Sequence, residues 1–169
     1  IDRGWYQAAK EIQEQRFAEA AKTLEEVLTV KPDLGMAHGK LGAVYASLGQ
    51  KEKAREHFEV VSRFDPGEPY GDYMLGWTAY LDGQHSEAIE HYLRAEEMEP
   101  RNVKMKYHRG MAHLGASQWD HAAAAFKGVL VLDPKHSGAY QGLSHAQRGL
   151  GQKPEAVKNA QRAAQLTGY

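Results

Sequence analysis

Nine histidines are the residues of this sequence best suited to bind a metal ion or transfer a proton. His108 and His113 stand five residues apart, which places them about 140 degrees apart around a helix. Zinc sites need three or four converging ligands, and neither an HExxH motif nor a paired Asp/Glu cluster accompanies these two residues. Separate predicted elements hold His57, His85, His91 and His121. The histidines therefore predict no metal site.

Other catalytic chemistry is not supported by the residue types either. The chain contains no cysteine, which excludes disulfides, thiol catalysis and thiolate metal sites. The glycines lie within or between predicted helices rather than after a strand, so they do not form a phosphate-binding loop. We therefore expect a non-catalytic protein that needs no cofactor.

An aromatic stripe in residues 70–81 is the clearest sign of a binding surface. The segment reads YGDYMLGWTAYL, and steps of three, four and three residues place one set of rings on a single helix face. This set is Tyr70, Tyr73, Trp77 and Tyr80. A second apolar stripe is formed by Leu75, Gly76 and Ala79. A helix that is apolar on two faces must cover both, either inside the protein or under a ligand.

A repeat of constant period positions this helix in a larger pattern. Prolines recur at positions 32, 66, 100 and 134, and glycines recur at positions 42, 76 and 110. Within one period, two apolar runs of helical spacing flank the residues Leu48, Gly49 and Gln50, which are typical of a tight turn. Each period is therefore predicted to form a helical hairpin that its proline ends. A glycine within a helix costs about 1 kcal/mol relative to alanine, so the recurring glycine predicts a close crossing of two helices.

The order of Leu-Gly, Tyr, Ala, aromatic residue and Pro in each period resembles the tetratricopeptide repeat family. In the second period the matching residues are Leu41, Gly42, Tyr45, Ala54, Phe58 and Pro66. The resemblance implies an all-α fold, a right-handed α-solenoid of helix-turn-helix repeats with about ten antiparallel helices. It covers the chain as a single array over residues 1–169. The five repeats would span about 1–34, 35–68, 69–102, 103–136 and 137–169.

Both terminal repeats depart from this pattern. In the first repeat, Trp5, Ala8 and Ile12 fit the family spacing only when shifted by one residue, which predicts a shorter turn before Phe17. The last repeat has Ser144, Ala160 and Gly168 in the slots of the glycine, the aromatic residue and the proline. We expect the last helix to cap the array poorly or to be followed by another helix. Because the sequence does not start with methionine, we expect it to be a segment of a longer protein.

The resemblance also implies that the first helix of each repeat lines a concave groove. The residues predicted to bind a partner there are Tyr70, Tyr73, Trp77, Tyr80, Lys104, Tyr107, Met111, His145 and Arg148. Such a groove suits an extended peptide or an amphipathic partner helix that carries apolar anchors and an acidic flank. The alternative is that Trp77, Tyr80 and Leu114 only pack between successive first helices.

Comparison with the family narrows the choice of ligand. Members that bind the C-terminal carboxylate of chaperones use Lys, Arg and Asn at five registers. The corresponding residues here are Gly39, Ala43, Met74, Lys104 and His108. Only Lys104 matches, so chaperone-tail binding is not predicted. In the fourth repeat, Arg109 and His113 replace apolar residues, and we expect their stems to pack while their polar heads stay in water.

The net charge of −1 hides opposite charges in the two parts of the chain. Residues 1–102 carry 12 Lys and Arg against 19 Asp and Glu, whereas residues 103–169 carry 9 against 3. The alternative function is therefore a homo-oligomer assembled head to tail, unless the charges only solvate two surfaces. The overall neutrality disfavours a nucleic-acid partner, and no apolar run is long enough for membrane insertion. We expect a soluble chain, with the cytoplasm favoured.

Overall fold

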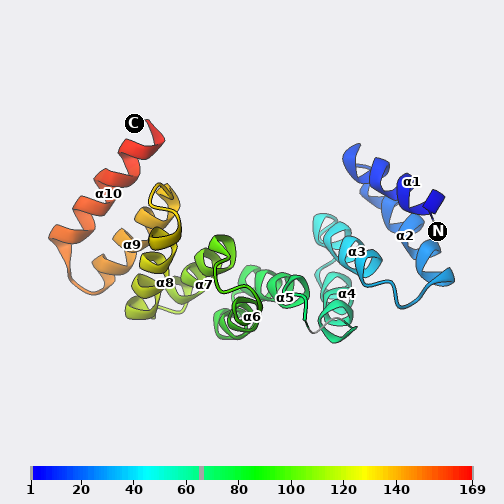
Figure 1. The fold of residues 1–169 in the computed structure, drawn as a ribbon, viewed down its shortest axis with the longest axis horizontal. Coiled ribbons are helices and arrows are strands. Elements are labelled where there is room, and N and C mark those ends of the chain that lie inside the picture. Colours follow the sequence, from blue (N-terminus) through cyan, green and yellow to red (C-terminus); the bar gives the residue numbers. More distant parts are fainter. Residues whose placement is uncertain (1, 65–66, 169) are drawn as a thin grey trace. The chain divides into compact units, whose positions relative to one another are not determined.

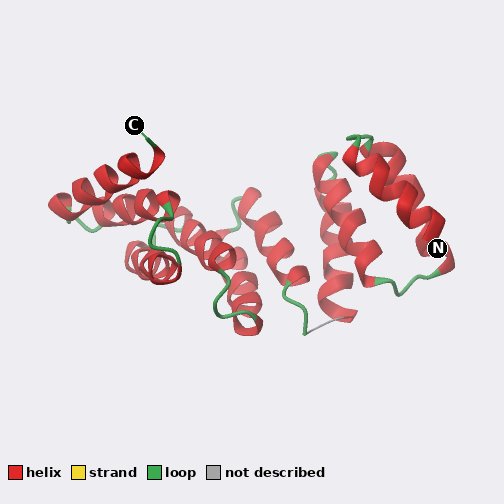
Figure 2. Cartoon of the chain, turned by 45° about the horizontal axis from the view of Figure 1, so that its top comes forward, coloured by secondary structure: helices red, strands yellow, loops and turns green. Residues whose placement is uncertain are grey.

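The structure, a computed structural model, describes residues 2–64 and 67–168, and every regular element in these ranges is a helix (Figures 1 and 2). The helices of these ranges are α1 (Asp2–Gln13), α2 (Phe17–Val30), α3 (Gly35–Ser47), α4 (Lys51–Phe64), α5 (Tyr70–Leu81), α6 (His85–Met98), α7 (Val103–Gly115), α8 (Trp119–Leu132), α9 (Ser137–Gly149) and α10 (Lys153–Thr167). The predicted all-α fold of five helix-turn-helix repeats is confirmed for this part of the chain.

The chain forms two compact units, Ile1–Thr78 and Ala79–Tyr169, and the boundary between them falls inside α5. In the first unit, α2 packs against α1 and α3, and α3 packs against α4. In the second unit, α7 packs against α6, α8 and α9, while α9 packs against α8 and α10. Each unit is thus a stack of hairpins in which neighbours contact one another. The single array over residues 1–169 stays a prediction.

Aromatic rings rest directly on the recurring glycines. A Cβ atom added at Gly42 would lie 2.6 Å from Phe58 Cε1, and one added at Gly110 would lie 2.8 Å from Phe126 Cε1. The ring of Phe126 also covers Gly142 of the next hairpin, where a Cβ atom would come within 2.4 Å. No side chain fits at these contacts. A ring of the neighbouring helix therefore occupies the space that a side chain at each of these glycines would need.

The hairpin turns contain one residue with a left-handed backbone. Gly49, Gly83 and Gly151 have φ angles of 73°, 75° and 75°. Glycine adopts this conformation without the steric cost that a side chain brings. In the first and fourth hairpins the same position holds Gln15, with φ 58°, and Ser117, with φ 55°. The turn predicted at residues 48–50 is therefore confirmed and is shared by all the hairpins described.

The first hairpin turn has the same length as the later ones. Residues 14–16 separate α1 from α2, and residues 48–50 separate α3 from α4, so the predicted shorter turn is wrong. The register is not shifted. Instead, a polar residue occupies an apolar position: Glu11 stands one repeat before Tyr45, is buried, and accepts a hydrogen bond of 2.8 Å from Thr23 Oγ1.

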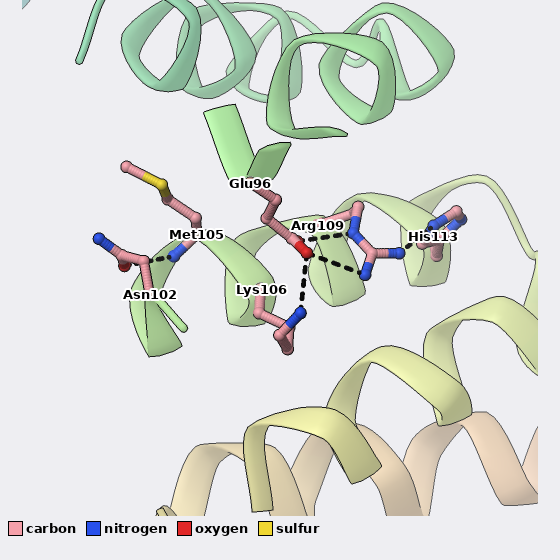
Figure 3. A network of polar contacts seen from close by, with 6 residues as sticks. All are labelled: Glu96, Asn102, Met105, Lys106, Arg109 and His113. Atoms are coloured by element: carbon pink, nitrogen blue, oxygen red, sulfur yellow. Dashed lines mark hydrogen bonds and ion pairs between the residues drawn. The ribbon is translucent and has the colours of Figure 1, made fainter. Parts of the chain in front are cut away.

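A buried ion pair joins α6 to α7. Glu96, only 8% exposed, extends from α6 toward two cations of α7 (Figure 3). Arg109 Nε donates to Glu96 Oε1 at 2.7 Å, and Lys106 Nζ donates to Glu96 Oε2 at 2.9 Å. His113 is also buried, with Nδ1 2.7 Å from Gln118 Oε1. The expectation that the heads of Arg109 and His113 stay in water is therefore wrong, because both have partners inside the protein.

Candidate functional site

Two exposed apolar side chains of the first unit line an open cavity of about 600 Å³. Met36 of α3 is 69% exposed, and Tyr70 at the start of α5 is 40% exposed. The Tyr70 ring covers Gly39, where a Cβ atom would lie 2.9 Å from Cε1. Lys40 also lines the cavity, and its ammonium group lies 5.4 Å from the ring centroid of Trp5. Glu68 lines the same cavity, which therefore combines apolar surface with one cation and one carboxylate.

The aromatic stripe of α5 does not remain on one open surface. Tyr73 is only 8% exposed, and burial, together with the neighbouring Tyr70, raises the pKa of its hydroxyl to about 12. Trp77 is half-buried. In the second unit, Tyr80 is half-buried and its ring centroid lies 5.6 Å from that of His85. Burial removes Tyr73 from the surface that a partner can reach, which contradicts its assignment to an exposed wall.

Three of the predicted residues come together in the second unit. Tyr107 and Met111 of α7 and His145 of α9 line an open cavity of about 210 Å³. The remaining residues of its wall are Leu114, Gly138, Gln141 and Gly142. The Tyr107 ring lies 4.8 Å from the His136 ring between centroids, which fixes its orientation. Lys104 is exposed one turn before Tyr107 on α7.

A larger cavity of about 780 Å³ lies between α9 and α10 and contains the last two predicted residues. His145 and Arg148 are exposed on α9, and the His145 ring stacks on Trp119 with 6.0 Å between centroids. Sequence reasoning missed Trp119. A signal was present at Gly149, which repeats Gly115 one period later: a Cβ atom there would lie 2.4 Å from the Trp119 ring.

Several histidines are held neutral by their surroundings. Burial lowers the pKa of His108 to about 4, and the nearby Lys104 ammonium group acts in the same direction. The ring of His108 lies between those of Tyr92 and Tyr107, at centroid distances of 6.1 Å and 5.6 Å. Burial also lowers the pKa of His57. His108 and His57 are therefore uncharged near neutral pH.

The free energy of unfolding is expected to fall as the pH drops from about 6.5 towards 4. The unfolded chain protonates its histidines near their ordinary pKa, whereas folded His108 protonates only near 4, so the unfolded state gains protons first. The substitution His108→Leu should flatten this dependence in urea titrations at pH of about 7.5 and 4.5. The exposed His145→Leu variant is the control, and equal slopes for both variants would contradict the prediction.

The described residues contain no group of three or more His, Cys, Asp or Glu side chains placed to hold a metal ion. Within the same ranges, every helix is too short or too polar to cross a membrane. Among the open cavities of the described residues, three contain residues predicted to bind a partner, and two of these share Gln141 and His145.

Stacked helical hairpins with a repeating glycine and ring contact define a helical-repeat protein. Two models of the tetratricopeptide repeat match residues 11–77 and 73–137, so the chain belongs to the tetratricopeptide repeat family. This result confirms the resemblance drawn from the sequence.

Two curated relatives are similar to this chain over part of their own length. Peptidyl-prolyl cis-trans isomerase FKBP4 of Mus musculus is 31% identical over 151 residues, which are 85% of this chain and 32% of the relative. Transcription factor tau subunit sfc4 of Schizosaccharomyces pombe is 26% identical over 102 residues, 59% of this chain and 10% of the relative. The chain thus spans a third or less of the length of these two relatives.

Solved structures show the same fold. A crystal structure of MamA has a TM-score of 0.89 at 24% identity, with 95% of this chain and 94% of that chain covered. MamA from Desulfovibrio magneticus RS-1 gives 0.92 at 18% identity, covering 98% and 94%. YrrB, described as a TPR protein with an unusual peptide-binding site, gives 0.81 at 20% identity, covering 94% and 82%. These similarities establish the fold alone.

Proposed function

We propose that this chain is a non-catalytic scaffold that binds a peptide or partner helix along the exposed stripe of its first helices. The observation that carries the proposal is the same in both units: large apolar side chains at this stripe line open cavities. Met36 and Tyr70 do so in the first unit, and Met111 and Tyr107 do so in the second. Methionine adapts to varied partners, and tyrosine offers an apolar face with a polar tip.

The chemistry of the stripe indicates the chemistry of the partner. Lys40 and Glu68 line the cavity of the first unit, and His145 lines that of the second. Lys104 and Arg148 add positive charge on α7 and α9. Apolar anchors with an acidic flank complement these walls. The peptide-binding site named for YrrB supports the same kind of role for this fold.

Peptides selected from a random display library provide the test, with binding measured by isothermal titration calorimetry on the purified chain. Met36→Glu and Met111→Glu each place a carboxylate on the stripe, and we expect at least one of them to weaken the selected peptide by about tenfold or more. The matched control is Val131→Glu on α8, where the side chain is 81% exposed outside these cavities. If both stripe variants bound as tightly as the control, the proposed site would be wrong.

A further inference from the structure

The cavity between α9 and α10 lies where Ala160 replaces the ring of the preceding repeat. In the fourth repeat the Phe126 ring fills the space above Gly110. The same registers in the last repeat hold Ser144 and Ala160, both of which line the cavity. Ser144 Oγ donates a hydrogen bond of 2.7 Å to the Ala156 carbonyl oxygen. The space that a ring occupies one repeat earlier is therefore left open to solvent.

The wall of this cavity also differs in polarity from the preceding layer. In the fourth repeat, the side of α7 that faces α9 presents Tyr107, Met111 and Leu114. The corresponding residues of α9 are Gln141, His145 and Arg148, all exposed. Small residues of α10 form the opposite wall: Ala160, Ala163, Ala164 and Thr167. A helix that packs in this cavity would contact the basic residues His145 and Arg148 at its rim. The small residues of α10 form its floor and leave room for one large side chain.

We propose that the α9–α10 cavity binds a helix of a partner protein that presents one bulky apolar residue flanked by acidic residues. The bulky residue would enter the space above Ala160, in the place that Phe126 fills within its own repeat. The acidic residues would meet His145 and Arg148 at the rim. Residues 103–169 carry 9 Lys and Arg against 3 Asp and Glu, so the surrounding field also favours an acidic helix.

A second copy of this chain is a poorer match for the cavity. Its first helix does expose a large ring, because Tyr6 is 76% exposed. However, Arg3 and Lys10 lie three residues before and four residues after Tyr6, on the same helix face, and both are exposed. That face would bring like charges against Arg148. Residues 1–102 of a second copy are acidic overall, with 19 Asp and Glu against 12 Lys and Arg, but the basic residues beside Tyr6 favour a separate acidic partner for this cavity.

This inference deepens the proposed function and rests on its partner chemistry, because His145 and Arg148 belong to the stripe, but it concerns a separate cavity at the end of the second unit. The probe is a fluorescein-labelled alanine-based peptide of roughly 16 residues, with one central Phe and with Glu three residues before it and four residues after it. Fluorescence anisotropy at low salt measures its binding to the purified chain. We expect saturable binding below about 1 mM, and at least about tenfold weaker binding when Phe becomes Ala.

Two kinds of variant test whether the peptide occupies this cavity. The double variant Ser144→Gly/Ala160→Phe restores the glycine and ring of the fourth repeat, and Ala164→Leu fills the floor in a second way. Both should weaken the peptide by about tenfold or more while circular dichroism shows an intact fold. Arg148→Glu should weaken it similarly, whereas Lys127→Glu, an equal charge change at an exposed position of α8, should not.

Each result contradicts either this inference or the proposed function. No binding below about 1 mM, or equal binding by the wild-type and filled variants, would overturn the inference. So would sedimentation velocity showing a dimer that the filled variants abolish, because the cavity would then belong to a second copy. Failure of the stripe variants Met36→Glu and Met111→Glu to affect the library peptides would overturn the proposed function alone, since those peptides are selected without reference to this cavity.

Discussion

Replacing Phe126 with alanine is expected to lower the free energy of unfolding of the second unit by about 3–5 kcal/mol. The side chain is fully buried, and its ring lies against Gly110 of α7 and Gly142 of α9. It therefore connects α8 to two other helices. Neither glycine can extend into the space that the substitution leaves, so a cavity should persist.

Urea unfolding followed by circular dichroism, combined with amide hydrogen exchange of α7 to α9, measures this effect. The exchange data assign the loss to the second unit. Val131→Ala on the same helix removes an exposed side chain and should change stability by less than about 0.5 kcal/mol. A Phe126→Ala loss as small as that of the control would show that the ring does not hold the hairpins together.

Replacing Glu96 with leucine is expected to cost about 3–5 kcal/mol, because it leaves two cations at a buried position without their carboxylate. Arg109 and Lys106 both bond to Glu96, and the side chains of all three are mostly buried. Chemical unfolding at neutral pH gives the magnitude. Lys10, in the exposed pair with Glu14, provides the comparison, since Lys10→Ala should cost less than about 1 kcal/mol.

The double variant Glu96→Leu/Arg109→Leu separates the ion pair from the position that it occupies. Leu130 and Leu143 stand at the same two registers one repeat later and belong to one apolar cluster. Copying these two leucines should recover most of the stability that Glu96→Leu loses, because neither a buried carboxylate nor the guanidinium remains. A double variant as unstable as the single one would show that Lys106 alone requires the carboxylate.

The fold could be predicted from the sequence because the residues that end helices, form turns and pack between helices recur at one constant period. The recurrence of Pro, Gly and ring positions at this period was enough to place the hairpins, and the turn at Gly49 was recognised from its residue types. The surroundings of polar residues at apolar registers were predicted less accurately. Arg109 was expected to reach water, but its partner Glu96 belongs to another helix, and a pairing across helices leaves no signal in the spacing of a single helix.

The candidate site followed from the sequence only in part, for a related reason. Helical spacing predicted the stripes that contain Tyr70, which is exposed, and Tyr107 and Met111, which are half-buried. Helical spacing could not predict that Tyr70 is exposed and Tyr73 is buried, because both are tyrosines on one stripe. The exposure of each side chain depends on the neighbouring helices. Trp119 was missed because it starts a second helix and reaches α9 only through the tertiary packing.

The ring shared between consecutive hairpins limits how such a chain can change in length. Because Phe126 meets Gly110 of its own hairpin at registers that recur with the repeat, duplication of one whole repeat would keep a ring opposite a glycine within the hairpin, whereas the register of Gly142 holds His108 and Met74 in the two preceding repeats. A block of any other size would place a side chain there instead. Growth by whole repeats therefore preserves the ring contact within each hairpin but not the contact with the next hairpin. α10 has Ala160 at the register of the ring, so a hairpin added after α10 would have to supply its own aromatic residue for this contact.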